Sequence, residues 1–241
     1  MNYKIINTGS DGNATVIANI ILIDCGVSFH KLEPYVKNLQ LVLLTHFHQD
    51  HFNKTTISRL SKDRPTLRFG CCKWLVQELI DCGVDKRNID VYVLNKKAIY
   101  SNNLKIKPVK LYHDVPQCGY KIEIDKYKVF YATDTRTLEG IKAIDYDYYF
   151  VEANYVNDDE LHNRAYNDYY ENRVKNTHLS EEQATDWLLE NMGLNSVYKF
   201  MHQHKEKNNG KKIIWKRETI NRKMWICVWN IKKRKYTTQS L

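Results

Sequence analysis

One stretch decides the fold of this chain: Leu41-Val42-Leu43-Leu44-Thr45-His46-Phe47-His48-Gln49-Asp50-His51. Its four leading apolar residues predict a short strand that is buried on both faces. Three imidazoles and a carboxylate follow at once, and such a cluster is costly to bury unless its members are paired. A divalent metal removes that cost, because neutral imidazole and carboxylate are good ligands for zinc, manganese or iron. The stretch therefore predicts a metal site at the carboxyl end of a strand, rather than a polar loop that happens to be rich in histidine.

The spacing within this block divides its side chains between two ions. Residues two apart in an extended segment point the same way, so His46 and His48 can bind one ion together. Asp50 and His51, at the turn into the next helix, can then face a second ion. The HxHxDH block resembles the signature of the metallo-β-lactamase-fold hydrolases. That resemblance implies an α/β protein with a four-layer αβ/βα sandwich, and it requires further ligands later in the chain.

Polar residues at the ends of later predicted strands supply these ligands. His113 is the expected third ligand of the first ion, and Asp134 is the expected bridge, which would keep two divalent ions ~3.5–4 Å apart. His202 is the expected last ligand, with His204 as the reserve candidate. Asp24 also ends a strand, and we expect it to orient a ligand. The expected sets are His46, His48, His113 and Asp134 for the first ion, and Asp50, His51, Asp134 and His202 for the second.

Within the superfamily, the chain resembles the small YycJ-like branch over residues 5–209. The matching pieces are Gly9-Ser10-Asp11-Gly12-Asn13, Asp24-Cys25-Gly26, Tyr112-His113-Asp114, Thr133-Asp134, Glu152-Ala153-Asn154, Thr177-His178-Leu179-Ser180 and His202 through Asn209. That branch contains DNA exonucleases, and phage phosphodiesterases that destroy cyclic pyrimidine nucleotides in the anti-Pycsar response share its fold. Two features depart from the branch. Tyr155 stands where histidine is usual, and the residues after Asn209 do not resemble the usual C-terminal helix and strand.

Charge is distributed unevenly along the 241 residues, whose net charge is +9. Residues 205–241 carry twelve Lys/Arg and two Asp/Glu, which leaves residues 1–204 with a net charge of −1. The resemblance ends at Asn209, and it therefore implies a catalytic domain over residues 1–209 and a basic, tryptophan-containing extension over residues 210–241. The extension is either a contact for nucleic acid, a contact within a homodimer, or a solvated tail.

The sequence also predicts where the protein resides. No apolar run approaches the ~20 residues that span a bilayer, and the N-terminal residues lack the apolar core of a signal peptide. We therefore expect a cytoplasmic protein, in a bacterium or an infected host cell, with no membrane partner. The six cysteines form no CxxC pair and are expected to be buried thiols in a reducing compartment.

The remaining pattern predicts two runs of strands with helices between them. A polar, tyrosine-rich helix is expected to form a lid, and a capping pattern marks the start of the last helix. The expected helices are 29–38, 53–61, 71–82, 157–173 and one that begins at Ser180. The expected strands are 3–7, 14–18, 20–23, 41–44, 66–69, 89–94, 98–100, 104–111, 119–124, 128–131, 146–152 and 196–201.

Two close divalent ions, Zn²⁺ or alternatively Mn²⁺, predict hydrolysis. Such ions lower the pKa of a shared water, generate hydroxide at neutral pH and neutralise a phosphodiester as charge grows on its oxygens. Asp50 is expected to act in catalysis as well as in metal binding. His178 is expected to reach the scissile phosphate or the leaving oxygen, unless it is only a structural residue at the start of a helix.

The substrate class divides into three alternatives. A near-neutral catalytic domain favours a small cyclic nucleotide, such as cyclic CMP or cyclic UMP, because a nuclease usually neutralises several phosphates along a groove. The basic extension favours the alternative, a metal-dependent DNA or RNA nuclease. A different ester or thioester hydrolase on the same metal core is the third class.

Overall fold

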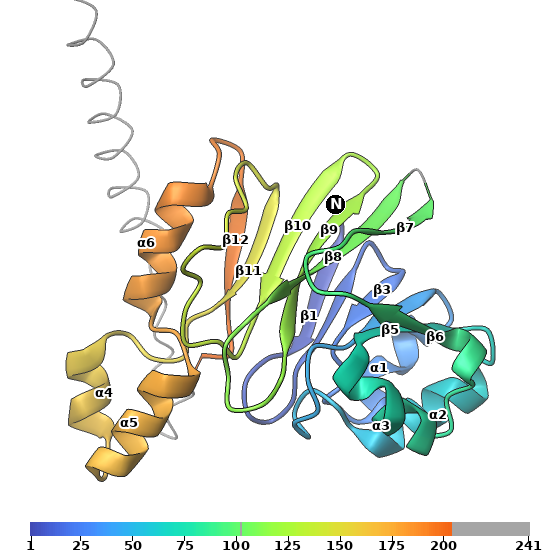
Figure 1. Cartoon of the computed structure of the whole chain (residues 1–241), viewed down its shortest axis with the longest axis horizontal. Helices are drawn as coiled ribbons and strands as arrows, with labels where there is room; N and C mark the ends of the chain where they lie inside the picture. The colour runs from blue at the N-terminus through green and yellow to red at the C-terminus, as the bar shows by residue number, and fades with distance from the viewer. Residues whose placement is uncertain (102, 204–241) are drawn as a thin grey trace, which may run out of the picture.

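Two mixed β sheets pack face to face at the centre of the protein (Figure 1). The computed structural model describes residues 1–101 and 103–203. In spatial order, the first sheet contains β1 (Tyr3–Asn7), β2 (Ala14–Ile17), β3 (Ile21–Ile23), β4 (Leu41–Leu43), β5 (Arg68–Cys72) and β6 (Ile89–Tyr92). In spatial order, the second sheet contains β12 (Val197–Met201), β11 (Tyr148–Glu152), β10 (Tyr127–Ala132), β9 (Cys118–Ile124), β8 (Leu104–Lys110) and β7 (Ala98–Ser101).

Each sheet is antiparallel at one end and parallel at the other. In the first sheet, β1, β2 and β3 pair antiparallel, and β3, β4, β5 and β6 pair parallel. In the second, β7 to β10 pair antiparallel, and β10, β11 and β12 pair parallel. The parallel strands of one sheet send their carboxyl ends to a single edge, where α/β proteins place their sites.

Helices cover the outer faces of both sheets, so the protein has four layers (Figure 1). Beside the first sheet lie α1 (Phe29–Val36), α2 (Lys54–Asp63) and α3 (Val76–Asp81), with short 3-10 turns at Lys73–Leu75 and Lys86–Asn88. Beside the second sheet lies α6 (Glu181–Asn191), preceded by α4 (Asp158–Arg164) and α5 (Asp168–Thr177). This arrangement confirms the predicted αβ/βα metallo-β-lactamase sandwich.

The apolar run before the histidine block is buried on both faces, as predicted. Val42 and Leu44 belong to the apolar cluster under α1 to α3, whereas Leu41 and Leu43 belong to the cluster between the sheets. A third cluster, which includes Trp187, joins the second sheet to α6. Side chains alternate along a strand, so a strand between two apolar layers must be apolar throughout.

Two predicted helices were wrong in extent. The predicted helix 71–82 is in fact the end of β5, a 3-10 turn and then α3; Cys71 and Cys72 pair with β6 instead of starting a helix. The predicted helix 157–173 is two helices, because the side chain of Asn167 accepts a hydrogen bond from Tyr170 N and starts α5 afresh. Asparagine is a preferred N-cap residue, so Asn167 can begin a second helix.

Other sequence predictions have mixed outcomes. The capping box at the start of α6 is present, with Ser180 and Gln183 bonded reciprocally. The cysteines among the described residues are buried and free. Within the same part of the chain, no helix is long and apolar enough to cross a membrane. The proposed boundary at residue 209 and the extension over residues 210–241 lie outside the described residues.

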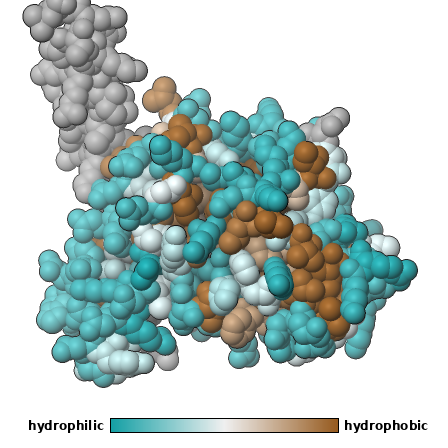
Figure 2. Space-filling model, in the orientation of Figure 1, coloured by the Kyte–Doolittle hydropathy of each residue, from teal (hydrophilic) through white to brown (hydrophobic). Residues whose placement is uncertain are grey.

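The visible face in Figure 2 is mostly hydrophilic, and its hydrophobic residues gather mainly over the half that contains β5 and β6. Val91, Val93 and Ile99 on or beside the edge strands β6 and β7 are the exposed aliphatic residues at this side. At the opposite side, β1 lies near β11 of the second sheet: the Met1 amino group donates to the Tyr148 hydroxyl, and the Tyr3 ring contacts the Tyr148 ring.

Candidate functional site

Histidines and carboxylates from both sheets meet at one edge of the sandwich. The first sheet delivers its histidines in the loop after β4, and the second delivers single residues after β8, β10 and β12. Within the described residues, three overlapping groups have ligand atoms that all lie within 4.8 Å of one another. They are His46, His48 and His113; His46, His51 and Asp134; and Asp134, Glu152, His178 and His202.

In the first group, hydrogen bonds fix the ring tautomers. Thr45 Oγ1 donates to Asp24 Oδ1 at 2.9 Å, so the same hydroxyl accepts from Nδ1 of His46, also at 2.9 Å. Nδ1 of His113 donates to the carbonyl of Thr177 at 3.0 Å. In both rings the lone pair is therefore left on Nε2, the atom that can bind a metal.

Asp24 lies behind the second group, where the sequence places an orienting residue. His51 Nδ1 donates to Asp24 Oδ2 at 2.8 Å, and Asp24 Oδ1 accepts from Thr45 N at 3.0 Å. The His51 Nε2 atom then faces Asp134 Oδ2 at 2.5 Å and Asp50 Oδ2 at 3.5 Å. Asp24 adopts a left-handed backbone with φ of 58°, a conformation that Asp and Asn tolerate better than most residues.

His202 joins the same carboxylates from the other sheet. Its Nδ1 contacts Asp134 Oδ1 closely, and its Nε2 lies 3.8 Å from Asp50 Oδ2. The backbone N–H of His202 donates to Thr8 Oγ1 at 2.7 Å, which holds the residue at a φ of 53°. The reserve candidate, His204, lies outside the described residues. The structure therefore brings all seven predicted ligands to one site, with Asp50 at its more exposed side.

Burial and opposite charges together shift the ionisation of this cluster. Burial disfavours the charged form of Asp134, but His202 and His51 outweigh burial and hold its pKa well below 3.8. Burial likewise opposes protonation of His51, yet Asp134 and Asp24 raise its pKa well above 6.5. The pKa of His202 rises to about 10, because Asp134 and Glu152 outweigh its burial.

The donor set fits divalent ions. Nε2 of His46 is buried and no described residue forms a hydrogen bond with it, whereas the two buried carboxylate oxygens of Asp134 face nitrogens of His51 and His202. Burial and the nearby His51 lower the pKa of His46 well below 6.5, so its ring is neutral and able to donate a lone pair. Buried polar atoms without partners are rare and costly, and nitrogen with carboxylate oxygen is the donor chemistry of zinc and similar metals.

Glu152 is a site residue that the sequence predictions missed. Its Oε1 accepts a hydrogen bond from Nδ1 of His178 at 2.6 Å, and its Oε2 accepts from Thr135 N at 2.6 Å. Nδ1 of His178 also lies 3.5 Å from Asp134 Oδ1. The sequence carries a signal for Glu152, since it ends a buried strand as Asp134 follows one.

The family follows from a comparison of the sequence with protein-family models. A family described as the beta-lactamase superfamily domain matches residues 19–202. The chain belongs to the beta-lactamase superfamily. No match was found among curated proteins. The finer resemblance to the YycJ-like branch, or to the anti-Pycsar phosphodiesterases, stays a prediction.

Solved structures share the fold of this superfamily member at low sequence identity. Human tRNase Z, short form, is 14% identical with a TM-score of 0.64, and the match covers 85% of this chain and 93% of that one. YhfI from Bacillus subtilis, a metallo-beta-lactamase fold protein, is 16% identical with a TM-score of 0.62, covering 83% and 85%. A diphosphatase from the PhnP family is 14% identical with a TM-score of 0.58, covering 83% and 85%.

Two further residues of this beta-lactamase superfamily protein touch the site without having been predicted. Asn13 Nδ2 lies 2.8 Å from His51 Nε2 and 3.3 Å from Asp50 Oδ2. Asp114 Oδ1 lies 3.1 Å from Nε2 of His113 and 3.4 Å from that of His48. Asn13 follows a glycine-rich turn, and Asp114 follows an expected ligand. The sequence around each residue does not mark that residue itself as part of the site.

Tyr155 occupies the position where the YycJ-like branch usually has histidine. It is buried in a small cluster with Leu161 and Val174, which anchors α4 and α5 to the body of the superfamily fold. Burial raises the pKa of Tyr155 to about 12, so its hydroxyl stays protonated. The residue therefore acts in packing.

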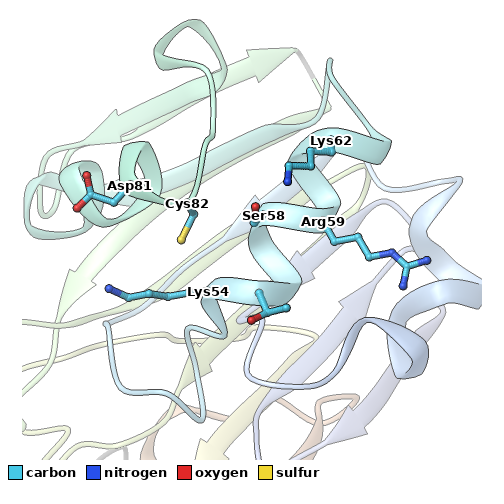
Figure 3. Close-up of a pocket in the computed structure, with 7 residues that line it drawn as sticks. Lys54, Ser58, Arg59, Lys62, Asp81 and Cys82 are labelled. Carbon is cyan, nitrogen blue, oxygen red and sulfur yellow. The ribbon is translucent and has the colours of Figure 1, made fainter.

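A pocket lies apart from the metal ligands, between α2 and α3 (Figure 3). Most of its charged side chains contact neighbouring side chains. Lys54 pairs with Glu78 at 2.6 Å, and the Arg59 guanidinium lies 3.8 Å from the centre of the Phe29 ring. The residues that line the pocket are Lys54, Thr55, Ser58, Arg59, Lys62, Asp81 and Cys82. None of the expected metal ligands lines this pocket.

Proposed function

We propose that the protein is a dinuclear-metal phosphodiesterase that hydrolyses nucleotide phosphodiesters. One observation carries the proposal: nitrogen donors from both sheets converge on Asp134, whose two buried oxygens face His51 and His202. A carboxylate with donors on both sides suits two adjacent ions, and two adjacent ions suit an in-line displacement at phosphorus.

The ligand groups divide between two positions that share Asp134. Zinc is the expected metal because histidine nitrogens predominate, and manganese is the alternative. When bound, two such ions would activate water at neutral pH and neutralise the charge that develops on the phosphate oxygens. The first position would use His46, His48, His113 and Asp134, and the second would use Asp50, His51, Asp134 and His202.

Glu152 and His178 are suited to move a proton. Because Nδ1 of His178 donates to Glu152, the ring is held in one orientation and its Nε2 is the nitrogen left to serve the substrate. Although burial opposes ionisation, the nearby His178 lowers the pKa of Glu152, so the carboxylate stays charged and stabilises an imidazolium. This pair would protonate the leaving oxygen, the task expected of a general acid beside a scissile bond.

A small cyclic nucleotide, such as cyclic CMP or cyclic UMP, is the preferred substrate. The net charge of −1 over residues 1–204 supports it, because one phosphate needs little besides the metals and a few donors. A nuclease is the second candidate, supported by the likeness to tRNase Z at a TM-score of 0.64. The PhnP-family diphosphatase also supports phosphoester chemistry in general.

The test is hydrolysis by the purified full chain loaded with zinc or with manganese. Cyclic CMP, cyclic UMP, cyclic AMP and single-stranded DNA are compared, with and without prior treatment with EDTA. We expect turnover of a cyclic pyrimidine nucleotide that EDTA abolishes and added metal restores. His30→Ala is a matched control, because His30 is exposed on α1. Activity indifferent to EDTA, or no hydrolysis of any phosphodiester, would overturn the proposal.

A further inference from the structure

An aromatic ring flanked by two cations lies beside the metal ligands. Lys110 Nζ is 4.9 Å from the centre of the Tyr112 ring, and Arg136 Cζ is 5.8 Å from it. All three side chains are exposed. Tyr112 directly precedes His113, and Arg136 follows Asp134 by two residues, so the cluster is built on the segments that carry two of the expected ligands.

Backbone hydrogen bonds hold these two segments together. Tyr112 N donates to Thr135 Oγ1 at 3.1 Å, and Arg136 N donates to the Tyr112 carbonyl at 2.9 Å. The position of the ring therefore depends on the same local structure that positions the ligands. A subsite built in this way keeps its geometry relative to the scissile bond, as a substrate-positioning residue must.

The strand pattern places Lys110 on the inner face of its sheet. Ile106 belongs to the cluster between the sheets, whereas Val109 belongs to the outer cluster against α6. β8 pairs with β9 without a bulge, so side chains alternate regularly and Lys110 shares the face of Ile106. Lys110 is thus an exposed cation at the end of the face that looks towards the first sheet.

The two cations have no acidic partner. Among the described residues, neither Lys110 nor Arg136 has a carboxylate within 4.0 Å, whereas Lys175, for example, is paired with Glu171. Two unpaired cations close to an exposed tyrosine form a surface that attracts oxygen-rich, flat ligands. Nucleobases suit such a surface, because they stack on aromatic rings or guanidinium planes and carry nitrogen or oxygen acceptors at their edges.

We propose that Tyr112, Lys110 and Arg136 form the subsite that binds the nucleobase of the substrate. Both cations lie over the Tyr112 ring in this structure. These exposed side chains would move to the rim of the ring as the base stacks against Tyr112, and would there donate to acceptor atoms of the base or of its sugar. This assignment rests on the proposed function only in taking a nucleotide as the substrate. It names the part of the nucleotide that the metal site itself does not recognise.

The experiment measures binding to the zinc-loaded full chain by calorimetry. The ligands are CMP, UMP and AMP, compared with ribose 5-phosphate, which has the sugar and the phosphate but lacks a base. We expect nucleotides to bind more tightly than ribose 5-phosphate. In Tyr112→Ala this preference should fall by roughly 5- to 150-fold, the range that alanine substitution gives for a base stacked on an aromatic ring. Tyr112→Phe should retain it.

Charge removal and control variants complete the design. Lys110→Gln and Arg136→Gln should each reduce the preference for nucleotides, whereas Lys4→Gln on β1 and Tyr169→Ala on α5 should not change it. An equal preference in Tyr112→Ala and the wild type would overturn the inference. If phosphodiesters are not hydrolysed but the base preference is present and depends on Tyr112, the proposed function fails and the inference stands. If hydrolysis is observed without any base preference, the inference fails alone.

Discussion

The substitution Asp24→Asn separates the role of Asp24 in metal binding from its role in folding. In the folded protein Asp24 Oδ2 accepts a hydrogen bond from Nδ1 of His51 at 2.8 Å, which leaves the lone pair of the neutral ring on Nε2. An amide in the same place can keep its oxygen towards Thr45 but presents N–H groups to the ring. His51 must then carry its proton on Nε2, which points at Asp134 and at the expected ion.

The magnitude follows from this change of tautomer. Loss of an outer partner of a metal-binding histidine costs about 10–100-fold in metal affinity, or about 1.4–2.8 kcal/mol. We expect that loss for the second ion and little change for the first. Stability should be nearly unchanged, because asparagine tolerates the left-handed backbone and still accepts from Thr45. By contrast, Asp24→Ala leaves the buried N–H of Thr45 without an acceptor and should cost about 1–3 kcal/mol.

The assay is a competition titration. Metal-free protein is reloaded with Zn²⁺ against a chelator of known affinity, and thermal unfolding of each variant is recorded in parallel. Asp11→Asn, at an exposed position, is the matched control. Two ions bound with wild-type affinity by a folded Asp24→Asn protein would refute the reasoning, since Nε2 of His51 would then not be the atom that faces the metal.

Three further perturbations test the same site. Asp134→Ala should lose both ions by elemental analysis and at least about 10²-fold in activity, whereas His178→Ala should retain its metal; equal metal loss would make His178 a ligand. In the metal-free protein His202 is protonated up to its raised pKa of about 10, so an ion must displace a proton; zinc affinity should therefore rise with pH through the neutral range, and a pH-independent affinity would contradict this. Gly26→Ala would place a Cβ 1.7 Å from the Asp50 carbonyl oxygen and should cost about 3 kcal/mol or more, measured as a lower urea midpoint.

Much of the fold could be predicted because its strands have short, distinct patterns. The run before the histidine block is apolar at every position, which suits only a strand covered on both faces. The helix expected over residues 71–82 shows the limit of such patterns. An amphipathic segment of this length fits the end of a strand followed by a short helix as well as one helix, and only pairing with β6 decides between them.

The site residues could be predicted where a histidine or an aspartate follows a predicted strand. Glu152 was not predicted as a site residue, because no histidine lies near it in the sequence to mark the strand end as part of the site. Its neighbour across the sheet is informative: Glu152 pairs with Met201, and the next residue, His202, places its Nδ1 3.4 Å from Glu152 Oε1. Register between strands 50 residues apart is a tertiary property, and a single sequence does not carry it.

The expected ligands come from both sheets, so metal binding would affect the stability of the folded protein and its resistance to degradation. His46, His48 and His51 follow a strand of the first sheet, whereas His113, Asp134 and His202 follow strands of the second. Ions held between the halves would bind the folded chain and not the unfolded one, so each tenfold rise in free metal above the dissociation constant adds about 1.4 kcal/mol per ion to the free energy of unfolding. Scarcity of metal would raise the unfolded fraction and expose the chain to proteases, so that metal supply would govern how much of the protein persists, as well as how fast it works.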